Sequence, residues 1–184
     1  VPISLDTRKA SVARAALQEG VEIINDVSGL AFDPRMARVV AESGAGLVIN
    51  HSRGTPTDMK EFAVYRSLLS EVTAELRLRM EQAVDSGVDM ESIIIDPGFG
   101  FAKTAEQSFE ILKHLREFLS LGRPVLVGPS RKSFLSRGGE LPPEDRLEES
   151  LAASVVAAVN GAHIVRTHDV AATKKALRVA DRVR

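Results

Sequence analysis

The chain has 184 residues, of which 44% are hydrophobic and 27% charged, and its formal net charge is −1. These proportions exclude a disordered chain, and the near-zero charge argues against a protein that holds nucleic acid through its phosphates. Cysteine is absent, which excludes disulfides, thiolate nucleophiles and cysteine-ligated zinc. Neither a long apolar run nor a signal-peptide pattern occurs, so we expect one cytoplasmic domain over residues 1–184 that binds neither nucleic acid nor a membrane.

Six short aliphatic runs follow one another along the chain, and a helical pattern comes after each run. Continuous branched aliphatic residues indicate strands buried on both faces, as in a parallel sheet covered by helices. In chain order, the runs end at Asp6, Asn25-Asp26, Asn50-His51, Asp96, Gly128 and Arg166. A glycine that can end a helix in the left-handed conformation precedes each of the last five runs, namely Gly20, Gly44, Gly87, Gly122 and Gly161.

Polar or charged side chains follow nearly every run, instead of gathering after one of them. An open doubly wound sheet collects its ligand groups at one switch point, whereas a closed (β/α)8 barrel collects them from all strand ends around one mouth. We therefore predict an α/β chain that forms a (β/α)8 TIM barrel, of which six β-α units are present. A complete barrel has eight units and about 250 residues. Because the chain opens on the strand-like segment 1–6, we expect that two amino-terminal units are absent and that 1–184 is the carboxyl-terminal three-quarters of the barrel.

Helix boundaries are predicted from capping residues and apolar spacing. Asp33-Pro34 places a capping side chain before a proline at the first helical position, and Thr104 to Gln107 is a capping-box pattern that opens a helix running towards Leu119. Leucines and a valine at helical spacing predict one long helix over residues 66–86. Residues 147–160 are expected to form a helix rich in small residues, which we expect to be able to pack against a second copy.

The segment Asp96–Lys103 reads Asp-Pro-Gly-Phe-Gly-Phe-Ala-Lys and directly follows a predicted strand. Its aspartate would be a fixed carboxylate at the barrel mouth, and its two glycines would let the backbone approach a flat ligand. Such a carboxylate can accept two parallel N–H bonds from a guanidine-like edge of a heterocycle. The alternative is a plain Pro-Gly turn that Asp96 caps.

Two later strands are followed by cationic loops. Residues 128–134 offer two cations, two hydroxyls and a phenyl ring, which suit an anionic or electron-rich planar substrate, although a solvated run of charges has the same pattern. Arg166 and His168 precede a helix whose first N–H groups point the same way, and this predicts an anion site. Alternatively, Asp169 is only a helix cap and His168 only a loop residue. Phosphate sites in barrels frequently follow the seventh and eighth strands.

Taken together, these segments resemble dihydropteroate synthase. The resemblance is carried by residues 96–103, 130–134 and 166–169 in this order and spacing, with 23–26 and 54–56 upstream, and it covers essentially the whole chain. Members of this family are (β/α)8 barrels. They join 6-hydroxymethyl-7,8-dihydropterin diphosphate to p-aminobenzoate, releasing pyrophosphate, in folate biosynthesis. These enzymes are the target of sulfonamides, which bind in competition with the substrates.

The resemblance implies a role for each matching residue. Asp6, Asn25 and Asp96 would hydrogen-bond the pterin, while Arg166 and His168 would hold the diphosphate. The expected catalytic residues are Lys132, Arg166 and His168. The expected substrate-binding residues are Asp6, Asn25, Asp96, Phe101, Gly128, Lys132, Ser133, Arg166 and His168, and none of them is expected to bind a metal.

The resemblance implies that the p-aminobenzoate site and the metal depend partly on segments of the family that residues 1–184 do not include. Lys132 would border the p-aminobenzoate site with Ser133 beside it, and Phe101 would lie near the join of the two sites. The implied Mg²⁺ has its main ligand in the family's first-strand segment, so the resemblance leaves open whether 1–184 is active by itself. It also implies a homodimer. Asn50-His51-Ser52-Arg53 stands where methionines are expected to flank the histidine, which predicts a wetter pterin pocket wall, and His51 itself is expected to be structural.

The implied reaction is a dissociative substitution at the exocyclic methylene of the pterin. Pyrophosphate leaves first, assisted by Mg²⁺, Arg166 and His168, and the neutral aryl amine captures the resulting cation. Two alternatives remain open at this point. A pterin-binding methyltransferase domain would share Asp6, Asn25 and Asp96 but has no use for a diphosphate clamp. The second alternative is a non-catalytic barrel that only binds pterin. This alternative would be favoured if the gene began at Val1.

Overall fold

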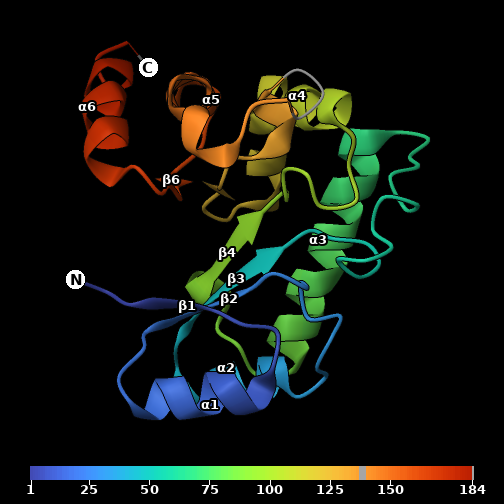
Figure 1. Ribbon diagram of the computed structural model, residues 1–184. Coiled ribbons are helices and arrows are strands. Elements are labelled where there is room, and N and C mark those ends of the chain that lie inside the picture. The colour runs from blue at the N-terminus through green and yellow to red at the C-terminus, as the bar shows by residue number, and fades with distance from the viewer. Residues whose placement is uncertain (137–139, 184) are drawn as a thin grey trace.

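The computed structural model describes residues 1–136 and 140–183 and shows helices arranged outside a central set of strands (Figure 1). Within this part of the chain, strands and α-helices alternate, as the repeating pattern predicts. The strands are β1 (Ser4–Asp6), β2 (Ile23–Asp26), β3 (Gly46–Asn50), β4 (Ile93–Asp96), β5 (Leu126–Val127) and β6 (Ile164–Val165). The α-helices are α1 (Ala10–Gln18), α2 (Met36–Ser43), α3 (Leu68–Asp85), α4 (Ala105–Lys113), α5 (Leu147–Val159) and α6 (Val170–Ala180). Short 3-10 helices are η1 (Met90–Ser92), η2 (Leu115–Leu121), η3 (Ser133–Leu135) and η5 (Pro143–Asp145).

The strands are parallel and lie side by side in chain order. A four-stranded sheet has the order β1-β2-β3-β4, and β5 pairs with β6. An isolated parallel bridge between Ile95 and Val125 joins the two sets. The register places Asp6 opposite Asn25 and Asn50 opposite Asp96. The polar ends of neighbouring strands therefore lie along one rim, as expected for consecutive strands of a barrel.

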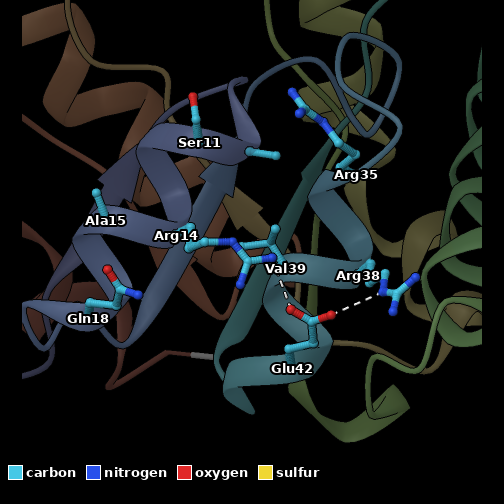
Figure 2. Close-up of a pocket in the computed structure, with 9 residues that line it drawn as sticks. Ser11, Arg14, Ala15, Gln18, Arg35, Arg38, Val39 and Glu42 are labelled. Carbon is cyan, nitrogen blue, oxygen red and sulfur yellow. Dashed lines mark hydrogen bonds and ion pairs between the residues drawn. The ribbon is translucent and has the colours of Figure 1, made fainter.

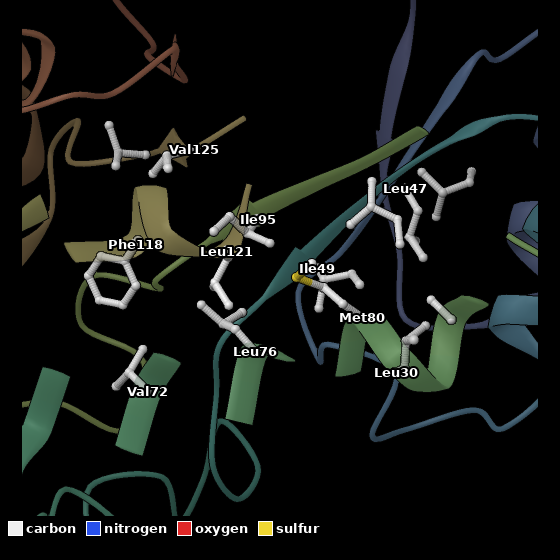
Figure 3. Packing of buried hydrophobic residues seen from close by; sticks show 14 of the residues in the cluster. Leu30, Leu47, Ile49, Val72, Leu76, Met80, Ile95, Phe118, Leu121 and Val125 are labelled. Atoms are coloured by element: carbon white, nitrogen blue, oxygen red, sulfur yellow. The ribbon is translucent and has the colours of Figure 1, made fainter. Parts of the chain in front are cut away.

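The hydrophobic core lies between the strands and the helices that cover them (Figure 3). Helix α3 contributes Val72, Leu76 and Met80, which are spaced four residues apart and so share one face. They lie among strand residues such as Ile49 and Ile95, and both of these are fully buried. Each such side chain contributes about 1.5–3 kcal/mol through burial. This packing fixes the strands whose ends carry the polar rim.

Glycine caps precede the strands at all five predicted positions. The φ angles of Gly20, Gly44, Gly87, Gly122 and Gly161 lie between 68° and 105°, in the left-handed region. The long helix predicted over 66–86 is α3, and the small-residue helix predicted over 147–160 is α5. No helix within the described residues is long and apolar enough to cross a membrane.

Two predicted helix boundaries are wrong. The capping box of Thr104 and Gln107 is present, but the helix does not continue to Leu119 because α4 ends at Lys113. The 3-10 helix η2 follows, and its buried residues Leu115, Phe118 and Leu121 are spaced by three, which matches the three residues per turn of that helix. At the other site, Pro34 lies in a turn and α2 begins at Met36.

Asp33 has a different role from the predicted helix cap. Its carboxylate accepts the N–H of Ala10 at 3.0 Å and the N–H of Arg35 at 3.1 Å, and it also pairs with the Arg35 guanidinium. The Arg35 side chain holds the pKa of this carboxyl well below its usual range. Asp33 therefore joins the turn before α2 to the start of α1, a contact that the local sequence does not reveal.

Candidate functional site

The first two strands end in a hydrogen-bonded pair of polar side chains. The amide nitrogen of Asn25 donates to the Asp6 carboxylate at 2.8 Å. Asn25 is only 6% exposed, and its amide oxygen Oδ1 is buried without a hydrogen-bond partner among the described residues. Leaving a buried acceptor unpaired costs about 1–3 kcal/mol. An N–H donor on a ligand would remove this cost, so Asn25 has the chemistry of a ligand contact.

Asp96 at the end of β4 is a buried carboxylate near several cations. Its Oδ1 accepts the N–H of Gly98 at 2.7 Å. Burial raises the pKa of Asp96, while the positive charges of Lys132, Lys103 and Arg166 act in the opposite direction. These cations favour the ionised form, which is an acceptor for two parallel N–H donors.

The turn after β4 lies directly against the end of β3. Gly98 has φ 73°, and a Cβ added there would lie 2.1 Å from the backbone oxygen of His51. Gly100 also has φ 73°, and Ala102 has φ 47°. Both glycines therefore meet a conformational requirement, and at Gly98 the close approach leaves no space for a side chain.

Lys132 connects the loop after β5 to this turn. Its ammonium donates to the carbonyl of Phe99 and lies 4.2 Å from the centre of the Phe101 ring. Burial lowers the pKa of Lys132 to about 8, and the nearby Asp96 opposes that shift. The predicted neighbours Lys132, Asp96 and Phe101 therefore belong to one region. Ser133 is exposed at the start of η3 beside Lys132.

The loops after β5 and β6 hold His168 in place. The Ser130 hydroxyl lies 2.9 Å from the His168 Nδ1 and accepts the His168 backbone N–H at 3.2 Å. Asp169 is the N-cap residue of α6, as the capping alternative has it, but its side chain makes no cap hydrogen bond and instead pairs with Arg131 at 2.9 Å. Ser130 and Arg131 had no separate roles in the sequence-based prediction, although both lie in the 128–134 motif. Here they position the end of β6.

Arg166 and Asp6 join the last strand to the first at the same rim. The Arg166 guanidinium contacts the Asp6 carboxylate. Their side chains are 53% and 43% exposed, and such an ion pair contributes only about 0–1 kcal/mol. An anionic ligand can therefore compete for Arg166 at small cost. Gly128 lies close by, because a Cβ added there would be 3.8 Å from the Arg166 Cβ.

A buried polar network behind the rim was not predicted. Lys103 Nζ lies 2.8 Å from His51 Nδ1, and His51 Nε2 lies 3.1 Å from Glu75. Arg53 also bonds Glu75. The available signal was that Lys103 ends the Asp96–Lys103 motif, but its partners are distant in sequence. Asn50, expected to wet the pocket wall, is 3% exposed and donates its amide to the carbonyl of Val27 at 3.1 Å.

The buried histidine makes folding stability sensitive to acid. Burial lowers the pKa of His51 from 6.5 to about 4. Between these two values the unfolded chain binds a proton that the folded protein does not bind, so acidification favours unfolding. We expect the free energy of unfolding to fall by up to about 3 kcal/mol across this window from this group. Urea unfolding at neutral pH and near pH 4.5 measures the change. The free energy of unfolding of the His51→Gln variant should fall clearly less between these two pH values than that of the wild type. An equal fall in both proteins would show that protonation of His51 is not the cause.

The described residues do not form a site for Mg²⁺. In 1–136 and 140–183, no group of three His, Asp or Glu side chains is arranged to hold a metal ion. Asp6 is engaged by Asn25 and Arg166, and Asp96 is bonded to Gly98. No chemical step is therefore assigned to a metal through these residues.

A cavity of about 520 Å³ lies away from the strand ends, between the outer helices α1 and α2 (Figure 2). Three arginines line it, but each is paired. Arg14 and Arg38 both bond Glu42, and Arg35 bonds Asp33. Each of these arginine side chains thus has a carboxylate partner within the protein and is also exposed to solvent. This cavity has no group comparable to the unpaired Asn25 oxygen, so the strand-end rim is the better candidate site.

Comparisons with known proteins identify the family of this chain. Residues 1–168 match the family described as pterin binding enzyme. Over 98% of its length the chain is 43% identical to dihydropteroate synthase of Synechocystis sp.. Over 97% of its length the chain is 45% identical to dihydropteroate synthase of Mycobacterium leprae. It spans 63% and 66% of these two proteins, which is just under two thirds of the curated relatives.

Solved structures show the same fold. Dihydropteroate synthase from Thermus thermophilus in complex with 4-aminobenzoate has a TM-score of 0.93 and 39% identity, and the match covers 100% of this chain and 74% of that one. The Yersinia pestis enzyme with a sulfonamide drug has a TM-score of 0.95 and 33% identity, with coverages of 100% and 66%. The predicted TIM-barrel fold, with six units in this chain, is confirmed. The chain belongs to the pterin-binding enzyme family, as a relative of its dihydropteroate synthases.

Proposed function

We propose that this chain provides most of the barrel of a dihydropteroate synthase. The enzyme would condense 6-hydroxymethyl-7,8-dihydropterin diphosphate with p-aminobenzoate to give dihydropteroate and pyrophosphate. The observation that carries the proposal is the unpaired, buried acceptor of Asn25 on the same rim as the buried Asp96 carboxylate. The relatives support it, since one dihydropteroate synthase was solved in the presence of pteroic acid and the Thermus thermophilus enzyme in complex with 4-aminobenzoate.

The pterin would be held by its N–H edge. Asp96 offers two carboxylate oxygens in a buried setting, and Asn25 offers one amide oxygen. A pterin carries amino and ring N–H donors along one edge, which matches these acceptors. Asp6, which already accepts from Asn25, would fix the orientation of that amide. Buried acceptors that only the correct heterocycle satisfies provide specificity as well as affinity.

The leaving group would lie toward the cationic side of the rim. In the reaction the carbon–oxygen bond at the exocyclic methylene breaks, and its electron pair leaves with pyrophosphate. Arg166 and His168 would stabilise this anion, with Ser130 holding the imidazole. The amine nitrogen of p-aminobenzoate then forms the new bond to the methylene carbon and releases a proton. No side chain acts as a nucleophile in this scheme.

The p-aminobenzoate would lie near Lys132 and Phe101. The Lys132 ammonium, 4.2 Å from the centre of the Phe101 ring, places a cation beside an aromatic face. Such a pair suits a benzoate ring, and Ser133 is next along the chain. A sulfonamide would compete for the same position, and the Yersinia pestis relative was solved with a sulfonamide drug.

A test of this assignment is Arg166→Ala in the full-length protein. Because Arg166 should meet the leaving group, the variant is expected to bind pterin diphosphate about tenfold or more weakly, while its affinity for 6-hydroxymethylpterin stays nearly unchanged. Isothermal titration calorimetry with both ligands measures the difference. Arg178→Ala, an exposed arginine on α6, is the matched control. Equal losses for the two ligands would contradict a diphosphate clamp and would favour methyl transfer on the same barrel.

Three further features remain proposals. If the enzyme uses Mg²⁺, its ligands would be residues other than those described, and the ion would supply positive charge at the leaving group. A homodimer would use α5, beside which an apolar groove of about 440 Å³ is lined by Phe109, Leu112 and Val156. We also propose a cytoplasmic location, where folate biosynthesis would require the enzyme.

A further inference from the structure

His51 is the point at which the end of β3 meets the turn after β4. Its backbone N–H donates to the carbonyl of Asp96 at 2.8 Å. Its own carbonyl lies so close to Gly98 that a Cβ there would be 2.1 Å from the oxygen. The amide of Asn50 also donates to this carbonyl at 3.3 Å. The backbone that carries Asp96 is therefore set by its contact with His51.

Lys103 adds a side-chain connection between the same two segments. Its ammonium lies 2.8 Å from His51 Nδ1 and donates to the Phe101 carbonyl at 3.0 Å. An ammonium has donors only, so Nδ1 accepts and the ring proton is on Nε2, which donates to Glu75 at 3.1 Å. The depressed pKa of His51 agrees with a neutral ring. The ammonium of Lys103 thus fixes the tautomer of His51.

The connection closes into a ring of contacts. Glu75 on α3 bonds Arg53 at 3.0 Å, and the Arg53 guanidinium lies 4.0 Å from the centre of the Tyr65 ring. The Tyr65 hydroxyl donates to the carbonyl of Ala102 at 2.9 Å. The contacts thus run from Lys103 through His51, Glu75 and Arg53 to Tyr65. This chain of contacts reaches the turn after β4 at both ends, at the Phe101 carbonyl and at the Ala102 carbonyl. The turn is held from two sides.

Burying the positive charge of Lys103 has an unfavourable desolvation free energy. Lys103 is 8% exposed, and burial lowers its pKa to about 7, an effect that Asp96 opposes. A neutral donor such as glutamine could bond the same histidine and carbonyl with less desolvation. If Lys103 only braced the turn, its charge would be a disadvantage. A charge near the buried Asp96 carboxylate has a use that a neutral brace lacks.

We propose that Lys103 is a positioning residue of the pterin site: its ammonium, bonded to His51 and to the Phe101 carbonyl, holds the turn that carries Asp96 and places a positive charge that opposes the effect of burial on that carboxylate. This inference rests on the proposed function, because it takes Asp96 as the acceptor for the pterin N–H edge. Lys103 acts through Asp96 and needs no contact with the substrate. The charged and titratable groups that face Lys103 are Asp96 from β4, Lys132 from the loop after β5, Glu75 from α3, and His51 and Arg53 from the segment after β3.

The test is the pH dependence of pterin binding by the full-length protein. Calorimetric titration with 6-hydroxymethylpterin, which lacks phosphate, is carried out from about pH 8 to about pH 4. Affinity should fall on the acidic side as Asp96 takes up a proton. Loss of the Lys103 charge raises the pKa of Asp96, so in Lys103→Met the midpoint should move up by about one pH unit. At about pH 6, where Lys103 with its pKa of about 7 is mostly protonated, affinity should also fall by about tenfold.

A second neutral variant separates charge from folding. Lys103→Gln keeps donors for His51 and for the Phe101 carbonyl, and it should show the same upward shift of the midpoint. Lys113→Met removes an exposed lysine from α4 and should leave the midpoint unchanged. A brace without an electrostatic role would lower stability but would not move the midpoint within the pH range over which circular dichroism shows each variant to be folded.

The outcomes are distinguishable. If the folded Lys103→Gln protein binds the pterin with the wild-type midpoint, the role of Lys103 is overturned while the proposed function stands. If the wild type does not bind the pterin, or binds it with no dependence on Asp96, the proposed function itself fails. An upward shift in both neutral variants, with none in Lys113→Met, supports the positioning role.

Discussion

Asp96→Asn is expected to lower the pterin affinity of the full-length protein by about 10- to 150-fold, which corresponds to about 1.5–3 kcal/mol. The substitution keeps the shape of the side chain and an oxygen for the Gly98 N–H, which Asp96 now accepts at 2.7 Å. It replaces one acceptor by an NH₂ group and removes the charge. An N–H edge of the ligand would then face a donor, and a charge-assisted buried pair would be lost.

Calorimetric titration with 6-hydroxymethylpterin measures this effect directly. Asp85→Asn, at the exposed end of α3, makes the same chemical change far from the strand ends and should leave the affinity unchanged. Circular dichroism shows whether both variants are folded. Wild-type affinity in a folded Asp96→Asn protein would remove Asp96 from the site and leave the rim without its central acceptor.

Gly98→Ala is expected to be among the most destabilising single methyl additions in this chain. At φ 73°, the new Cβ would lie 2.1 Å from the His51 carbonyl oxygen, a backbone atom that cannot rotate away. The turn would have to leave β3, and the Asp96 carboxylate would move with it. We expect a loss of about 3 kcal/mol or more in the free energy of unfolding, together with loss of pterin binding.

Gly44→Ala separates the two causes. Gly44 has nearly the same backbone angle, φ 68°, but nothing lies within 4 Å of its added Cβ. That variant should lose only the conformational part, about 1 kcal/mol, and should bind the pterin normally. Urea unfolding of both variants gives the comparison. Equal losses would show that the contact with His51 is not what requires glycine at position 98.

The sequence determined the backbone elements of this protein because their signals are local. Aliphatic runs that end on polar residues predicted the strands, and the glycines before them have the predicted left-handed angles. The capping box at Thr104 is likewise encoded within four residues. The repetition of these signals was sufficient for the barrel, since chain order and right-handed connections leave few other arrangements. Local signals failed at η2, where apolar spacing alone did not distinguish a 3-10 helix from a continued α-helix.

The partners of the polar side chains were decided only by the tertiary structure. Asp169 could cap its own helix, yet it pairs with Arg131, 38 residues earlier. Lys103 bonds His51 across 52 residues, and Arg166 contacts Asp6 across 160. Which of these side chains meet depends on strand register and on how closely the turn at Gly98 approaches β3. Those distances result from packing of the whole barrel, and no local window of residues contains them.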